Sequence, residues 1–329
     1  MKNKFKIKES EGGERLDKFL AAKMRELSRS KIQKLIKESL VIVNGKEESA
    51  HYLLRAGDLI EIISLKLKLK KAKKIKIAKM PKLKIISDTP EYLVIDKPAG
   101  LIAHGAEHIK EKTLADLILK KYPAIARVGE DKNRPGIVHR LDKEASGLMV
   151  IAKTRASFKN LKKQFQERKV GKKYSALVHG QIKKDEDEIN FPIERSSQGH
   201  KMAAMPFTNK GENNKEGREA ITFFHVEKRF INYTFLEAVI KTGRTHQIRA
   251  HLAAYGHPLV GDDLYGTNKN RLQNTRLLSQ AKLRGQEKLN LNRIFLVARE
   301  LSFKDLSGRK QTFKIELPSE LKNLLDIVK

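Results

Sequence analysis

The sequence contains no cysteine and no tryptophan, and aromatic residues make up only 6% of it. Without cysteine, disulfides, thiol nucleophiles and cysteine-ligated zinc are excluded, and a reducing, cytoplasmic setting is expected. No run of about 18 apolar residues is present, so no membrane-spanning helix is predicted. The first residues also lack the apolar core of a secretion signal. Stacking against a flat ligand must come from a few tyrosines or phenylalanines, from arginine planes or from aliphatic side chains.

What the chain has in excess is positive charge. Its 69 lysines and arginines stand against 39 acidic residues, which gives a formal net charge of +30 over 329 residues. Such an excess repels itself in a compact state and favours a polyanionic partner, with nucleic acid as the first candidate. A membrane surface is the alternative, but it would need a basic helix with bulky apolar residues on its opposite side. The length indicates a large catalytic domain with a small additional module.

The N-terminal stretch predicts two helices followed by short strands. Apolar residues recur at helical spacing in residues 16–24, and a second helix follows Ser28. Strands are expected at residues 41–43, before the tight turn Asn44-Gly45, and at residues 59–63. The exposed face of the second helix carries four basic residues. These are Arg29, Lys31, Lys34 and Lys37.

This order of elements, over residues 13–64, resembles the S4 RNA-binding domain, which is a small α/β module. The resemblance implies two helices packed on a small sheet, with the basic second helix facing RNA, since clustered cations bind phosphates. An ordinary solvent-exposed basic helix is the alternative. We therefore expect residues 1–64 to form an RNA-binding domain.

Residues 65–82 predict a linker. Ten lysines and no acid lie between Lys66 and Lys84, and like charges this dense extend the chain. Contact with an RNA backbone and a passive spacer remain equally open, and Pro81 marks the end of the segment. Residues 83–329 are then expected to form the catalytic domain.

Strands dominate the prediction for residues 83–329, with helices between them. Strands are expected at residues 85–86, 92–95, 137–138, 148–152, 174–178, 222–226 and 233–240, and helices at residues 114–119, 155–168 and 246–254. Few alternating strand–helix–strand units occur, so the pattern predicts an α+β fold with a mixed, largely antiparallel sheet. Residues 208–217 are a polar loop, and the basic residues 266–293 have no clear pattern.

The strongest chemical signal is GIVHRLDKEASGLMV at residues 136–150. We expect Asp142 to lie at the end of a strand, flanked by Arg140 and Lys143, where two cations keep a carboxylate ionised. An ionised carboxylate serves as a nucleophile rather than as an acid. A surface turn with ordinary ion pairs is the alternative for the RLDK stretch taken alone.

Four further motifs accompany it in order. They are PAGLIAH at residues 98–104, KYSALVHG at 173–180, KTGRTHQIRAHL at 241–252 and HPLVGDDLYG at 257–266. Together with the HRLD stretch they resemble the RluA family of pseudouridine synthases across most of residues 83–317, and order with spacing is far more specific than any single string. The N-terminal module and residues 290–295 favour the branch that modifies large-subunit ribosomal RNA, the synthase C type. Near the C-terminus, Val297 stands where histidine is common in the family.

The resemblance implies roles for individual residues. Asp142 is the essential carboxylate, Tyr174 stacks near the base and is a candidate for taking the proton from its carbon five, and Arg249 orients Asp142 in a bidentate pair. Arg140 enters the RNA stack when the target uridine leaves it. Ile248 packs on the flipped base, and His139 belongs to the RNA-binding set.

The implied reaction detaches uracil, turns it and rejoins it through carbon, so neither cofactor nor metal is expected. The target must be extruded from the RNA stack. His246 and His251 are five residues apart and do not share a helix face, which argues against a zinc site. A glycosidase pair is not predicted either, because Asp142 has only Glu144 nearby and Asp262-Asp263 resemble a turn.

The partner expected from these patterns is ribosomal RNA of the large subunit, with no membrane and no obligate protein partner, and the chain is expected to be a monomer. Two alternatives stay open: modification of tRNA, and a non-catalytic RNA-binding or ribosome-assembly factor. Neither the modified uridines nor the choice between attack on sugar and attack on base can be predicted.

Overall fold

The computed structural model describes residues 4–24, 27–37, 40–62, 83–105, 111–196, 201–205, 217–283 and 293–329. The chain divides into two compact units, residues 1–80 and 81–329. The predicted lysine-rich linker, residues 65–82, lies outside the described residues, as does most of the predicted polar loop at 208–217. The three-part division at residues 64 and 82 therefore stays a prediction.

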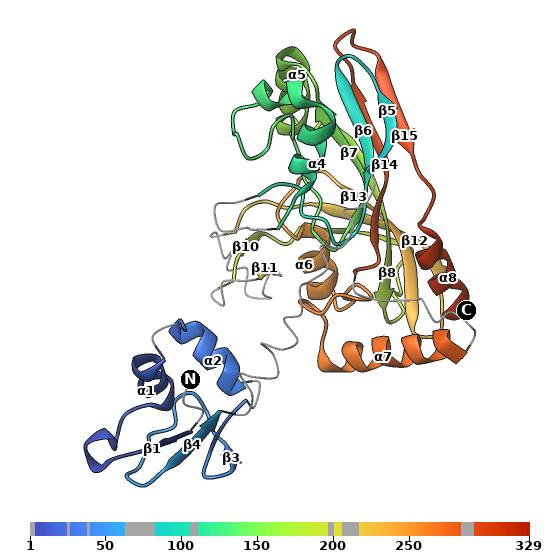
Figure 1. Cartoon of the computed structure of the whole chain (residues 1–329). Helices are drawn as coiled ribbons and strands as arrows, with labels where there is room; N and C mark the ends of the chain where they lie inside the picture. Colours follow the sequence, from blue (N-terminus) through green and yellow to red (C-terminus); the bar gives the residue numbers. More distant parts are fainter. Residues whose placement is uncertain are drawn as a thin grey trace. The chain divides into compact units, whose positions relative to one another are not determined.

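The first unit is a small antiparallel sheet with two helices. Its strands are β1 (Lys4–Lys6), β2 (Val41–Val43), β3 (Lys46–Glu47) and β4 (Leu59–Ile62), in the order β1-β4-β2-β3, and its helices are α1 (Leu16–Lys23) and α2 (Arg29–Lys37) (Figure 1). Both central residues of the β2–β3 turn, Asn44 and Gly45, have positive φ, as a two-residue hairpin turn requires. Apolar residues of both helices and of β2 and β4 form one core.

A buried carboxylate joins the two helices of this unit. Asp17 on α1 has no exposed surface and accepts hydrogen bonds from Arg15, Arg29 and Gln33 at 2.6 to 3.0 Å. Burial alone would raise the pKa of Asp17, but these donors outweigh it and the pKa is lowered. The first of the predicted RNA contacts, Arg29, is thus partly committed inside the unit.

The second unit is built on a nine-stranded sheet within the described segments (Figure 1). Its order is β5-β6-β7-β14-β8-β13-β12-β9, with β15 paired to β14. The strands are β5 (Lys84–Asp88), β6 (Tyr92–Lys97), β7 (Ser146–Ala152), β8 (Gly171–His179), β9 (Glu186–Ile189), β12 (Thr222–Arg229), β13 (Tyr233–Ile240), β14 (Leu296–Lys304) and β15 (Lys310–Lys314). A separate hairpin joins β10 (Ile193–Arg195) to β11 (Met202–Ala204).

All pairings recorded in this sheet are antiparallel except β7 with β14, which confirms the predicted mixed, largely antiparallel α+β fold. The helices of the unit are α4 (Leu114–Lys121), α5 (Arg155–Gln166), α6 (Gln247–Ala254), α7 (Asn268–Leu283) and α8 (Ser319–Ile327). The central strands are buried on both faces; every residue of β7 is buried.

One expectation from the sequence was wrong in detail, and the structure describes part of a segment that the sequence left open. Residues 137–138 are not a strand: Ile137 forms only an isolated bridge with Ile151, because the N–H of Val150 in β7 is accepted by the side chain of His139 and not by a backbone carbonyl. The segment at 266–293, which had no clear pattern, contains the sixteen-residue helix α7.

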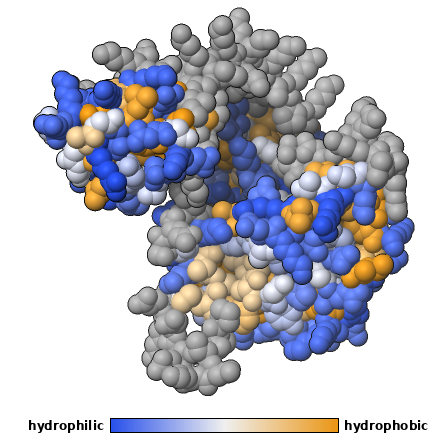
Figure 2. Space-filling view, turned by 90° about the horizontal axis from the view of Figure 1, so that it is seen from below, coloured by the Kyte–Doolittle hydropathy of each residue, from blue (hydrophilic) through white to orange (hydrophobic). Residues whose placement is uncertain are grey.

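Hydrophilic residues cover most of the described surface visible in the space-filling view (Figure 2). None of the helices in the described segments combines the length and apolarity needed to cross a lipid bilayer.

Candidate active site

The second unit holds a cavity of about 490 Å³. Its wall is formed mainly by the loop before β7, the start of β8, the loop between β13 and α6, and the first turn of α6. These segments are far apart in sequence, and they include three of the five motifs. This volume is within the usual range for sites that bind small molecules.

Asp142 lies in the loop before β7 rather than at a strand end, since the expected strand is absent. Its backbone carbonyl accepts the N–H of Ala145 at 3.2 Å, which closes a tight turn. The loop is also tied to its neighbour: the carbonyl of Lys143 accepts the N–H of Gly100 at 2.7 Å and the ammonium of Lys97 at 3.4 Å. The Asp142 side chain is 16% exposed, so it is held in the wall yet remains reachable from the cavity.

The buried Lys97 links the Asp142 loop to the loop that follows β6. It has no exposed surface, and its ammonium also donates to the carbonyls of Pro98 at 2.9 Å and Leu101 at 2.8 Å. Burial lowers the pKa of Lys97 to about 7, although the nearby Asp142 opposes that shift. Lys97 thereby connects the PAGL loop to the loop that carries Asp142.

Arg249 approaches Asp142, but not as the predicted bidentate pair. Its Nη1 lies 3.3 Å from Oδ2 of Asp142 and 3.4 Å from Oε2 of Glu144. The two-point contact goes instead to Asp262, whose Oδ2 accepts from Nε at 2.7 Å and whose Oδ1 accepts from Nη2 at 3.0 Å. A guanidinium has a fixed fork of donors, so the two-point contact with Asp262 sets the direction in which Nη1 points.

Two acids dismissed from the sequence therefore belong to the site. Glu144 converges with Asp142 on one guanidinium, although it is only two residues away. Asp262 was correctly placed in a turn, where its Oδ1 accepts the N–H groups of Leu264 and Tyr265, but the same buried carboxylate anchors Arg249. Burial would lower the pKa of Arg249, yet the hydrogen bonds and charge of Asp262 raise it, so the guanidinium stays protonated.

Tyr174 and Ile248 give the cavity its apolar lining. Tyr174 comes from β8 and is 6% exposed, and Ile248 comes from the first turn of α6 and is 4% exposed. Burial, with a smaller contribution from the charge of Asp142, raises the pKa of Tyr174, so the phenol is protonated at neutral pH. The predicted trio of Asp142, Tyr174 and Arg249 thus meets around one cavity.

The two cations that flank Asp142 in sequence point elsewhere. Arg140 is exposed at the cavity, with Nη1 3.5 Å from Nε2 of His104, and Lys143 pairs with Glu111 at 2.7 Å. Neither has a recorded ion pair with Asp142. The cation beside the Asp142 carboxylate is Arg249 instead.

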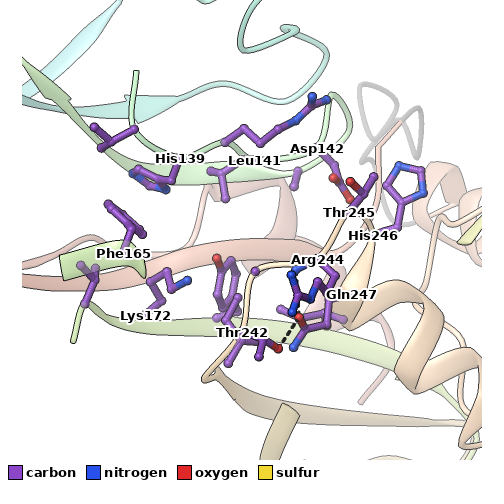
Figure 3. Close-up of a pocket in the computed structure, with 18 of the residues that line it drawn as sticks. His139, Leu141, Asp142, Phe165, Lys172, Thr242, Arg244, Thr245, His246 and Gln247 are labelled. Atoms are coloured by element: carbon purple, nitrogen blue, oxygen red, sulfur yellow. Dashed lines mark hydrogen bonds between the residues drawn. The ribbon is translucent and has the colours of Figure 1, made fainter. Parts of the chain in front are cut away.

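His139 lines the cavity, and the RNA contact predicted for it stays a prediction. Its Nε2 accepts the backbone N–H of Val150 at 3.0 Å, and its ring stacks on Phe165 with centroids 4.5 Å apart. Burial lowers the pKa of His139 to about 3, so the ring is neutral. It shapes one end of the cavity, while its Nε2 is occupied by the protein's own backbone (Figure 3).

His246 was considered in the sequence only as a metal ligand. It begins α6 in the left-handed region, with φ of 54°, and its Nδ1 lies 3.1 Å from the hydroxyl of Tyr265. His251 is bound separately, to Thr222 and to the carbonyl of Phe191. Among the described residues no cluster of three metal-binding side chains occurs; the expectation that no metal is needed stays a prediction.

Of the basic residues predicted on α2, Lys31 is exposed and Arg29 is partly exposed beside Asp17. The side chains of Lys34 and Lys37 lie outside what the structure describes. The role of this helix in RNA contact remains a prediction.

Comparisons with known proteins point to one enzyme family. The family model described as RNA pseudouridylate synthase matches residues 91–254, and that of the S4 domain matches residues 14–60. An uncharacterized RNA pseudouridine synthase of Aquifex aeolicus is 39% identical, covering 97% of this chain and 95% of its own length.

A relative from Pasteurella multocida, named ribosomal large subunit pseudouridine synthase D, is 32% identical over 98% of this chain and 94% of its own length. The solved structure of human RNA pseudouridylate synthase domain containing 4 has the same fold, with a TM-score of 0.55 and 24% identity over 74% of this chain and 92% of that one.

Proposed function

This chain belongs to the RNA pseudouridylate synthase family and carries an S4 domain, and we propose from this that it isomerises specific uridines of large-subunit ribosomal RNA to pseudouridine, with Asp142 as the reactive carboxylate. The observation that supports Asp142 most directly is its position in the cavity wall beside a guanidinium that Asp262 fixes at two points. The ribosomal substrate is supported by relatives named for the large subunit. The choice of the synthase C type stays a prediction, since these named relatives carry the synthase D name.

The reaction needs no net gain or loss of atoms. The bond between N1 of uracil and the ribose breaks, a bond from carbon five to the ribose forms, the proton on carbon five leaves, and N1 gains a proton. Asp142 attacks either the ribose carbon or the base ring, a choice that remains open. Nη1 of Arg249 lies 3.3 Å from Oδ2 of the attacking carboxylate and fixes its position.

The cavity then has to keep the detached base. Tyr174 and Ile248 provide flat and aliphatic walls for it, and a base held there can turn without being lost. We propose that Tyr174 contacts the base as a neutral phenol, because its raised pKa disfavours phenolate at neutral pH. Extrusion of a base costs a few kcal/mol of unstacking. We propose that Arg140, which is exposed at the cavity, enters the gap in the RNA stack and offsets part of that cost.

The test compares Asp142→Asn with Glu144→Gln, a matched loss of charge beside the same Arg249. Pseudouridine formation on a large-subunit ribosomal RNA transcript is expected to fall by at least about a thousandfold in Asp142→Asn, because the nucleophile is gone. RNA affinity should stay within a few-fold. Modification at the wild-type rate in Asp142→Asn would remove Asp142 from its proposed role.

The substrate is tested by mapping pseudouridines in ribosomal RNA and in tRNA from cells with and without the protein. We expect sites to disappear from large-subunit ribosomal RNA; their disappearance from tRNA alone would favour the tRNA alternative, and no change in either would favour a non-catalytic assembly factor.

We propose further that the protein acts in the cytoplasm as a monomer without an obligate protein partner. Light scattering of the purified protein measures its oligomeric state.

A further inference from the structure

Lys172 lies in the cavity wall on the strand that supplies Tyr174. Alternate residues of a strand point to the same face, so Lys172 and Tyr174 share the face toward the cavity, and Lys173 points the other way. Lys173 pairs with Glu237 on the neighbouring strand at 3.0 Å. The sequence therefore places two adjacent lysines in opposite environments.

The ammonium of Lys172 has no acidic or hydrogen-bonding partner among the residues that the structure describes. Its Nζ lies 5.4 Å from the ring centroid of Phe165. It also lies close to Gly243, which has no side chain to offer it a partner. The nearby His139 is neutral and offers no negative charge. Burial lowers the pKa of Lys172 to about 8, so the amine is still largely protonated at neutral pH.

Two other cations of the wall are held by carboxylates, whereas Lys172 is half-buried without one. Arg249 is held by carboxylates, and Arg168 makes a two-point contact with Glu219. Lys172 is half-buried in the cavity wall, so its solvation is reduced, and an aromatic ring offsets only about 0.5 to 2 kcal/mol of such a cost. An anion or a strong acceptor that enters the cavity would therefore find an ammonium that no carboxylate of the described residues neutralises.

The position of Lys172 in the cavity indicates which part of the substrate it faces. His139, Phe165 and Lys172 lie toward one end of the cavity, and Asp142 and His246 toward the other (Figure 3). The reacting base and ribose carbon must be at the Asp142 end. The group of a nucleotide that extends away from base and sugar and carries full negative charge is its phosphate.

We propose that Lys172 binds a phosphate attached to the extruded uridine, so that the cavity recognises a nucleotide rather than a free base and sugar. This inference rests on the proposed function, because it assumes uridine in the same cavity. A compact ammonium serves as a point-charge contact for phosphate oxygens.

The experiment measures dissociation constants of the full chain for uridine, uridine 5′-monophosphate and uridine 3′-monophosphate by titration calorimetry or NMR. In the wild type, one monophosphate should bind about tenfold more tightly than uridine, as one charge-assisted contact provides. Lys172→Met, which keeps the packing on Phe165, should abolish that difference and leave uridine binding unchanged. Lys173→Met is the matched control and should behave as the wild type.

Three outcomes would overturn the proposal. If Lys172→Met weakened the binding of uridine and of both monophosphates equally, Lys172 would contact the base or the sugar; if it changed none of them, Lys172 would only pack on Phe165. The third is a wild type that binds uridine and both monophosphates equally well. Lys172→Gln is a second neutral variant should the first not fold. Binding requires no turnover, so failure here is distinct from failure of Asp142→Asn to lose activity.

Discussion

At the scale of single residues, Asp262 controls the site without contacting the proposed substrate. It fixes two nitrogens of Arg249, and the third, Nη1, faces Asp142. Asp262→Asn keeps an oxygen for the N–H groups of Leu264 and Tyr265 but weakens the hold on the guanidinium. We expect kcat to fall about a hundredfold with little change in KM, because small misplacement of a reacting group has effects of that size.

Steady-state kinetics on ribosomal RNA check this, with Glu144→Gln as the control. The Glu144 side chain is 40% exposed and shares only Nη1, so its loss should cost less than tenfold. Equal losses in the two variants would mean that the charge around Arg249 matters, and not its orientation.

Tyr174 leads to a prediction about pH. Its pKa is raised above the ordinary value of about 10, so the phenol stays protonated from pH 6 to 9. A phenolate base would make the rate rise about tenfold for each pH unit below that pKa, whereas a neutral phenol gives no such slope. We expect single-turnover rates of the wild type to lack this slope and those of Tyr174→Phe to have the same pH dependence. A steep rise that Tyr174→Phe abolishes would contradict this.

The sequence was informative about which residues meet but not about how they bond. Family motifs correctly brought Asp142, Tyr174, Arg249 and Ile248 to one cavity. The sequence predicted Asp142 as the two-point partner of Arg249, whereas the partner is Asp262. Asp262 lies in a turn, and the sequence around a turn does not show that its carboxylate also contacts a guanidinium on another element. Lys172 was missed as well, although its spacing of two from Tyr174 on a strand was available.

At the scale of elements, the parallel contact between β7 and β14 depends on Gly147. This residue has φ of 119°, and a Cβ on it would lie 2.4 Å from the carbonyl oxygen of Ala298. Gly147→Ala should lower the free energy of unfolding by roughly 2 to 4 kcal/mol, through backbone strain and overpacking together. Urea denaturation measures this.

Gly308 is the matched control for that prediction. It also has positive φ, at 80°, but nothing lies within 4 Å of its Cβ position. Gly308→Ala should therefore cost only about 1 kcal/mol, the penalty of the left-handed backbone alone. If the two variants were equally stable, close packing at Gly147 would not be the reason for glycine there.

Strands and helices with strong periodicity were predicted well, including β6, β8, β13 and α5. Failures came where tertiary pairing decides. Ile137 has the composition of a strand, but it forms a single bridge with β7, and the neighbouring N–H of Val150 is accepted by the His139 side chain instead of a backbone carbonyl. Helix α7 is mostly polar and exposed, so it shows little of the apolar spacing by which a helix is recognised.

At the scale of the whole molecule, we expect the chain to separate RNA affinity from chemistry. Each unit has its own hydrophobic core. We expect residues 81–329 alone to keep kcat on ribosomal RNA while KM rises roughly tenfold or more, because phosphate contacts of the first unit are lost. The salt dependence of binding should become shallower, by about 0.9 in the logarithmic slope for each duplex phosphate contact removed.

Filter binding at several salt concentrations, together with kinetics, tests this division. An unchanged salt slope would mean that the first unit makes no phosphate contacts. A loss of kcat with KM unchanged would mean that it takes part in assembling the site.

The place of β14 in the sheet has a consequence for the timing of synthesis. The strand that ends the Asp142 loop, β7, is joined to β8 only through β14, which the ribosome makes some 150 residues after it. A polypeptide emerges N-terminus first, so an unfinished chain exposes its S4 module long before residues 142 and 174 can be brought together. We therefore expect each newly made molecule to bind RNA through its first unit before the proposed active site is complete.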